Sequence, residues 1–144
     1  IFEEIKKTFE MKKLNLIMLV FFLGFVITVK SALLPIFNIP PKIFDAIKVG
    51  NATELAKYFN SSIELVVINI DDVYSKQQAE KILKDFFDKN KVKNFNVLHQ
   101  GGKESAQYAI GSLETVNGKT YRVYFLLKGS GSNLLIHQMR IEEE

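Results

Sequence analysis

The sequence predicts an α+β domain in which helices pack on an antiparallel sheet, preceded by an N-terminal signal helix. Two observations support this class. Apolar residues recur at helical spacing through most of residues 42–90, interrupted by one β-branched stretch, and with a period of two from about residue 94 onward. Helices followed by a run of strands are typical of α+β folds. The expected element order is α-α-β-α-β-β-β-β over residues 42–144.

Residues 11–31 are predicted to be a signal peptide. Lys12 and Lys13 precede 16 uncharged, mostly apolar residues (14–29), and Ser31 supplies a small residue just before a plausible cleavage point. A positive start, an apolar middle and a small-residue exit are typical of a cleaved secretory signal. A membrane-spanning helix needs about 20 apolar residues, and this run of 16 is shorter. An inner-membrane anchor over residues 14–29 is therefore the alternative to a cleaved signal.

The segments on either side of this leader carry no predicted domain. Met11 followed by two lysines is a more natural start than the charged prefix, so we expect residues 1–10 to be an upstream start-site artefact. Residues 32–41 contain the run LLPIFNIPP, which ends any helix continuing from the leader and is interpreted as a linker. The predicted location is periplasmic or extracellular, without a lipid-modified cysteine because the chain has no cysteine.

The first half of the domain holds three predicted helices and one strand. A first helix ends near Gly50, and Asn51 with Glu54 starts a second with a pattern like a capping box. The β-branched run IELVVINI predicts a strand over residues 63–70, with Asp71 and Asp72 serving turn or capping chemistry. The clearest helix follows Ser75, its predicted N-cap, and carries a buried stripe. That stripe comprises Ala79, Ile82, Leu83, Phe86 and Phe87.

The second half reads as four antiparallel strands. Their sequences are NFNVLH, SAQYAIGSLET, KTYRVYFLLK and NLLIHQMRIE. Asn117-Gly118 is a strong signal for a hairpin between the second and third. In the third strand, Tyr121, Val123, Phe125 and Leu127 share one face, which we expect to lie against the helices.

Composition excludes several classes of function. Of the 19 basic and 16 acidic residues, five and three lie before Ser31, so the remainder carries a formal charge of only +1. A nearly neutral domain without a basic cluster does not fit nucleic-acid binding. The lack of cysteine excludes disulfides, a cysteine nucleophile and cysteine-bound zinc. No cofactor or metal is expected, because His99 and His137 have no carboxylate at ligand spacing.

Five longer motifs carry a family resemblance. They are GNATELAKYFNSSIEL, DVYSKQQAEKILKDFF, HQGGKESAQYAIGSLET, YRVYFLLK and LIHQMRIE, in this order from residue 44 to the C-terminus. Together they resemble a family of short secreted proteins from Bacteroidetes, domain of unknown function 4783, within the nuclear transport factor 2-like (cystatin-like cone) superfamily. The resemblance implies helices laid across a strongly curved sheet with a pocket between them. It implies no reaction.

The candidate binding residues are polar and aromatic side chains that interrupt otherwise apolar strands: Tyr108, Arg122, Tyr124, His137 and Arg140. They could form a binding patch or a homodimer surface on the open sheet face, or they could be scattered surface residues. Strand parity points His137 and Arg140 to opposite faces unless a bulge intervenes. No residue is predicted to be catalytic.

Three hypotheses about function follow. The leading one is an exported, non-catalytic domain that binds a small molecule in the pocket or a protein on the open sheet face. The second is an isomerase or lyase, which would need a buried carboxylate in that pocket as its base. The third retains the leader as an anchor and makes the domain a membrane-tethered interaction module.

Overall fold

The computed structural model describes residues 1–25 and 39–144 and divides the chain into two compact units, Ile1–Leu34 and Pro35–Glu144. In the first unit, helix α1 spans Phe2–Phe25. The predicted cleavage point after Ser31 and most of the predicted linker lie outside the described residues. In the described part of the chain, no helix is long and apolar enough to cross a membrane.

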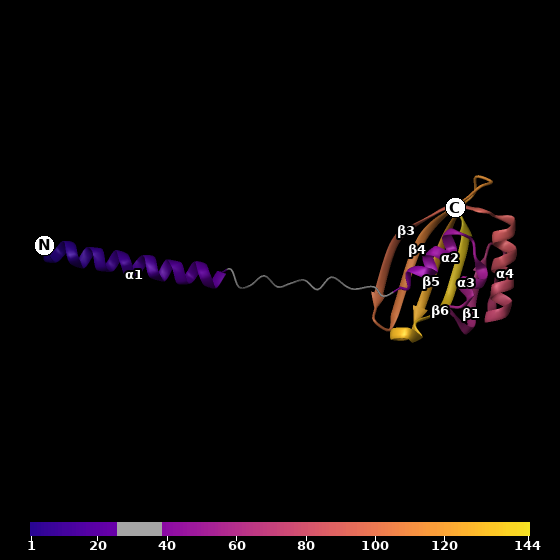
Figure 1. Cartoon of the computed structure of the whole chain (residues 1–144), viewed down its shortest axis with the longest axis horizontal. Helices are drawn as coiled ribbons and strands as arrows, with labels where there is room; N and C mark the ends of the chain where they lie inside the picture. The colour runs from indigo at the N-terminus through magenta and orange to yellow at the C-terminus, as the bar shows by residue number, and fades with distance from the viewer. Residues whose placement is uncertain (26–38) are drawn as a thin grey trace. The chain divides into compact units, whose positions relative to one another are not determined.

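The second unit is built on a six-stranded sheet with the order β2-β1-β6-β5-β4-β3. Neighbouring strands are antiparallel except β1 and β6, which pair in parallel. The strands are β1 (Phe59–Val67), β2 (Ile70–Ser75), β3 (Val92–Lys103), β4 (Ala106–Thr115), β5 (Thr120–Lys128) and β6 (Leu135–Glu143). The predicted α+β class is confirmed, with helices that accompany one curved sheet (Figure 1).

Three α-helices belong to this unit: α2 (Pro41–Lys48), α3 (Ala52–Ala56) and α4 (Lys76–Lys89). The predicted caps are confirmed. Asn51 accepts a hydrogen bond from the Glu54 amide at the start of α3, and Ser75 and Gln78 form a capping box on α4. A short 3-10 helix, Gly131–Asn133, lies in the connection from β5 to β6.

The helices all pack on one face of the sheet. Phe44 of α2 meets Phe125 with ring centroids 5.8 Å apart, and Phe86 of α4 meets Tyr121 at 5.1 Å. Both partners belong to the predicted inward face of β5, which is confirmed because its side chains are buried. The space between helices and sheet is occupied by apolar side chains that are fully buried, among them Ile43, Ile47, Leu55, Leu83, Leu113, Phe125 and Leu127.

The predicted strand over residues 63–70 was wrong at its end. The chain turns at Ile68 and Asn69, and a second strand, β2, pairs back on β1 through Val67 and Ile70. Asp71 and Asp72 therefore lie in an edge strand rather than in a turn or a helix cap. Two consecutive exposed carboxylates on an edge strand discourage pairing with another chain, which is a physical reason for their presence there.

A bulge interrupts β6 at His137. Ile136 pairs with Leu127, but the next paired residue of β6 is Gln138, which lies opposite Leu126. The alternation of buried residues shifts accordingly, from Ile136 to Met139. The predicted parity of β6 therefore holds on each side of the bulge but not across it, because an inserted residue reverses the phase of the strand. Gln138 and Arg140 then share the face that the helices leave uncovered.

Candidate functional site

The candidate site is the sheet face opposite the helices, here called the open face. Its centre on β4 and β5 consists of half-buried residues alternating with fully buried ones. The central half-buried residues are Tyr108, Ile110, Tyr124 and Leu126. No helix in the described part of the second unit lies on these side chains. Aromatic and aliphatic side chains left half-exposed on a sheet face form a surface suited to contact with another molecule.

Three of the five predicted residues come together on the open face. Tyr124 of β5 lies directly opposite Arg140 of β6, and its ring centroid is 6.3 Å from that of Tyr108 on β4. Cross-strand neighbours at this spacing contact one another. Sequence reasoning selected these residues by type, and the strand register brings them together.

The position of Tyr124 between Tyr108 and Arg140 affects the pKa of its hydroxyl. Burial raises the pKa of the Tyr124 hydroxyl above its ordinary value, and the neighbouring Tyr108 adds to the rise. The positive charge of Arg140 acts in the opposite direction. A phenol that keeps its proton remains a hydrogen-bond donor as well as an acceptor. Tyr124 therefore offers a neutral, amphipathic contact at the centre of the open face.

The other two predicted residues lie apart from this group. Arg122 is on the same face of β5, but its guanidinium is engaged at the chain end, with Nη2 2.9 Å from Glu144 Oε1. His137 occupies the bulge of β6 and is half-buried. The structure thus joins Tyr108, Tyr124 and Arg140 and leaves Arg122 and His137 outside the group.

Three polar residues around this group were not among the predicted binding residues. His99 Nε2 of β3 lies 3.1 Å from the Tyr108 hydroxyl, and Gln138 Nε2 donates to Glu64 Oε1 of β1 at 2.6 Å. The open face therefore carries polar and aromatic groups across five strands. Only the strand register shows that these residues are neighbours. The register depends on bulges at Leu98 and His137, and no residue pattern in the sequence predicts those bulges.

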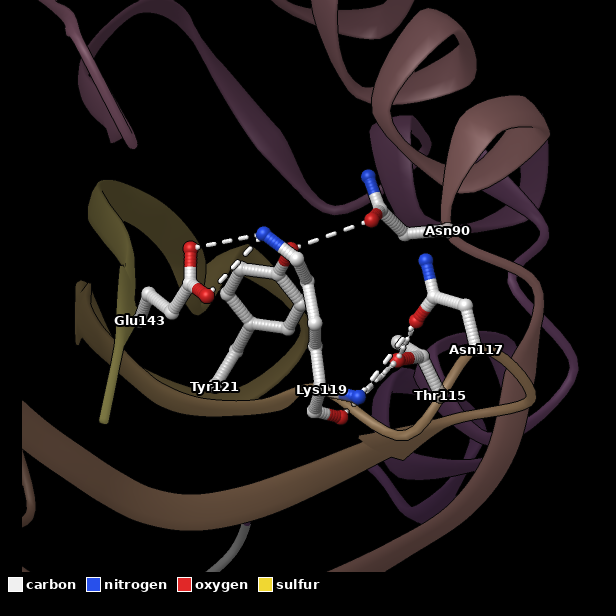
Figure 2. Close-up of polar contacts among 6 residues, drawn as sticks. All are labelled: Asn90, Thr115, Asn117, Lys119, Tyr121 and Glu143. Atoms are coloured by element: carbon white, nitrogen blue, oxygen red, sulfur yellow. Dashed lines mark hydrogen bonds and ion pairs between the residues drawn. The ribbon is translucent and has the colours of Figure 1, made fainter.

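The interior of the domain carries amides and hydroxyls rather than charges. Among the described residues, the buried polar side chains are Asn90, Gln107 and Thr115. Figure 2 shows two of these at one end of the domain, where the Tyr121 hydroxyl donates to Asn90 Oδ1 and Thr115 contacts Asn117 and Lys119. Among the described residues, no Asp or Glu is buried. The same residues contain no cluster of three or more His, Asp or Glu side chains that could bind a metal ion.

The comparison with protein families decides the classification. The model of the family "Domain of unknown function (DUF4783)" matches residues 40–142, which is most of the chain. The chain belongs to the DUF4783 family. A DUF4783 protein from Bacteroides ovatus is 40% identical, with a TM-score of 0.69, and the match covers 74% of this chain and 96% of that one. A Bacteroides fragilis member has 36% identity and the same TM-score, with coverage of 74% and 100%.

More distant structures share the fold alone. A designed protein of the nuclear transport factor 2 type is 15% identical with a TM-score of 0.58, and the match covers 70% of this chain and 90% of the design. This confirms that the DUF4783 domain has the nuclear transport factor 2-like fold predicted from its motifs. No curated protein matches the chain.

Proposed function

We propose that this DUF4783 protein is an exported, non-catalytic binding domain that acts through its open face, and that the partner is a second copy of the same chain. The observation that carries the proposal is the half-buried group of Tyr108, Tyr124 and Arg140 on a sheet face that no described helix of the domain covers. Tyrosine and arginine are enriched at protein interfaces, where a phenol or a guanidinium supplies both apolar area and hydrogen bonds.

The charges on the open face favour a second copy as the partner. Acidic and basic groups occur on adjacent strands, with Glu64 on β1 and Arg140 on β6, and both lie on the same side of the apolar centre on β4 and β5. A twofold interface places the same patch on both subunits, so a patch with both signs of charge can pair with itself. A face of one charge would repel its own copy.

The alternative of an isomerase or lyase has less support. That mechanism requires a carboxylate whose pKa burial has raised toward neutrality. In residues 39–144, every Asp and Glu is exposed or half-exposed, and apolar side chains occupy the space between helices and sheet. The chemistry of the described residues therefore favours binding.

Sedimentation velocity tests the role of the open face. The protein is expected to sediment as a concentration-dependent dimer, and Tyr124→Asp is expected to shift it to monomer because it places a charge in the apolar centre. Gln77→Asp adds the same charge to an exposed site on α4 and is the matched control. A wild-type monomer throughout the accessible concentration range, or a Tyr124→Asp protein that remains dimeric, would contradict the proposal.

Amino-terminal sequencing tests export separately. When the full chain is expressed in a bacterium with a periplasm, the proposal expects a mature protein that begins near Ala32 in the periplasmic fraction or the medium. A protein retained in the membrane with its leader intact supports the tethered alternative. Either result is independent of whether the domain forms a dimer.

A further inference from the structure

A second feature, separate from the open face, is a cleft between the β1–β2 turn and the second half of α4. Its volume is about 310 Å³, and Val67, Ile82 and Phe86 supply apolar lining. Small-molecule sites usually occupy about 300–1,000 Å³ and combine an apolar wall with a few polar groups. The cleft meets the lower limit of that range, and Asn90 is among its lining residues.

The turn that forms one wall of the cleft is strained at Ile68. This residue has φ of 54°, the single positive φ outside glycine among the described residues, at the first central position of a two-residue turn. A β-branched residue with left-handed backbone costs roughly 1–2 kcal/mol, and glycine would adopt it freely. Ile68 nevertheless lines the cleft and is 45% exposed.

Burial does not account for this strain. The Ile68 amide donates to the Ile141 carbonyl at 3.0 Å, a bond that any residue except proline could make at this position. The side chain itself stays half in solvent, next to Ile70, which is 38% exposed. Strained backbone that holds an exposed apolar side chain beside a cleft is a feature of ligand sites.

Two charges of opposite sign line the cleft. Asp85 and Lys89 stand one turn apart on α4, and neither makes a hydrogen bond or ion pair within the described residues. The neighbouring charges of the helix are paired instead, with Lys84 Nζ 2.7 Å from Asp88 Oδ2 and Lys91 Nζ 3.2 Å from Asp88 Oδ1. The cleft therefore offers one acceptor and one donor of full charge above an apolar wall.

We propose that this cleft binds a short apolar peptide in its zwitterionic form. An apolar side chain of the peptide packs against Ile68 and Phe86, its ammonium group faces Asp85, and its carboxylate faces Lys89. A simple fatty acid would leave Asp85 without a partner, and a simple amine would leave Lys89 without one. The pair of opposite charges thus selects a ligand that carries both.

Three matched peptides test the proposal by NMR titration of the full chain. The probes are leucyl-leucine, its N-acetyl derivative, which lacks the ammonium group, and its C-terminal amide, which lacks the carboxylate. Leucyl-leucine is expected to shift amide signals of residues 67–70 and 82–90 and to bind about two- to fivefold more tightly than either blocked form, since exposed ion pairs contribute modestly. Absence of shifts, or equal binding of all three, overturns the proposal.

Two variants separate ligand binding from folding. Ile68→Gly is expected to weaken binding of leucyl-leucine while the protein keeps or gains stability, because glycine removes both the side chain and the strain. Lys89→Gln is expected to reduce the preference for the free carboxylate, whereas Lys81→Gln, at another exposed position of α4, leaves it unchanged. Unaltered binding by the Ile68 and Lys89 variants, or shifts centred on the open face, would also overturn the proposal.

Discussion

The Tyr121 hydroxyl donates a hydrogen bond of 3.0 Å to Asn90 Oδ1, and this buried contact ties β5 to the end of α4 (Figure 2). Asn90 in turn donates through Nδ2 to the Phe86 carbonyl at 3.0 Å. The Phe86 ring meets the Tyr121 ring edge-on. One tyrosine thus joins an apolar contact and a polar contact between helix and sheet, beside the cleft that Asn90 and Phe86 line.

Tyr121→Phe is expected to destabilise the domain by about 1–3 kcal/mol, because Asn90 Oδ1 would remain buried without its donor. Chemical denaturation measures the loss. Tyr124→Phe removes a hydroxyl that makes no hydrogen bond within the described residues, so its effect should be much smaller. Equal losses in the two variants would show that the contact between Tyr121 and Asn90 adds no stability.

The Phe95 ring packs so close to Gly111 that we predict no larger residue fits at position 111 without loss of stability. A Cβ added at Gly111 would lie 2.4 Å from that ring and 2.9 Å from the Asn96 carbonyl oxygen, on the neighbouring strand. Gly111→Ala should therefore cost about 1–3 kcal/mol through overpacking. In the double variant with Phe95→Leu, the cost of the alanine should be smaller than in the wild-type background. Additive losses would contradict this close approach.

The helices of the domain were predictable because local signals agree with the fold. The capping pattern of Ser75 and Gln78 and the apolar stripe that follows both belong to α4 itself and need no distant contact. The inward face of β5 was predictable for the same reason, since alternation is a local property. The helices and β5 together carry about half of the buried core residues.

The turn at Ile68 could not be predicted from local signals. Neither glycine nor proline occurs between Ile63 and Ser75, and an isoleucine stands where positive φ favours glycine. The structure imposes the turn because β1 must pair with β2 on one side and with β6 on the other. A local rule broken at an exposed position is expected at a functional site, which agrees with the proposed role of the cleft.

The composition of the open face was predicted in part. Tyr108, Tyr124 and Arg140 were selected by residue type, but their grouping depends on the register among β4, β5 and β6. His99 and Glu64 were not predicted as members of the group, because they come from strands at its two ends. Register across bulges is set by packing of the whole sheet, which no single strand encodes.

Ser75→Ala is expected to destabilise the protein by about 0.5–2 kcal/mol, because the Gln78 amide at the start of α4 would lose its acceptor. Denaturation of the variant, together with its helical circular dichroism, checks the prediction. Ser61→Ala changes an exposed serine of β1 and should have little effect. A negligible change in the Ser75 variant would show that solvent caps the helix equally well.

The pH dependence of the free energy of unfolding should reflect the raised pKa of the partly buried Tyr124 hydroxyl. Burial raises its pKa in the folded state, so above the ordinary tyrosine value of about 10 the unfolded chain loses this proton first. The free energy of unfolding should therefore fall more steeply with rising pH in the wild type than in Tyr124→Phe. Arg140→Gln should raise the pKa of Tyr124 further, as measured by ultraviolet titration. A drop in that pKa would contradict the assigned influence of Arg140.

Pulsed electron paramagnetic resonance provides the most direct test of the central claim, that the open face joins two copies of this chain. The chain contains no cysteine, so a single introduced cysteine carries one spin label per subunit. A label at Lys128, at the exposed end of β5 on the open-face side, should give a short distance between subunits, and a label at Lys81 on α4 a longer one. No coupling between Lys128 labels, or a shorter distance between Lys81 labels, would contradict the account.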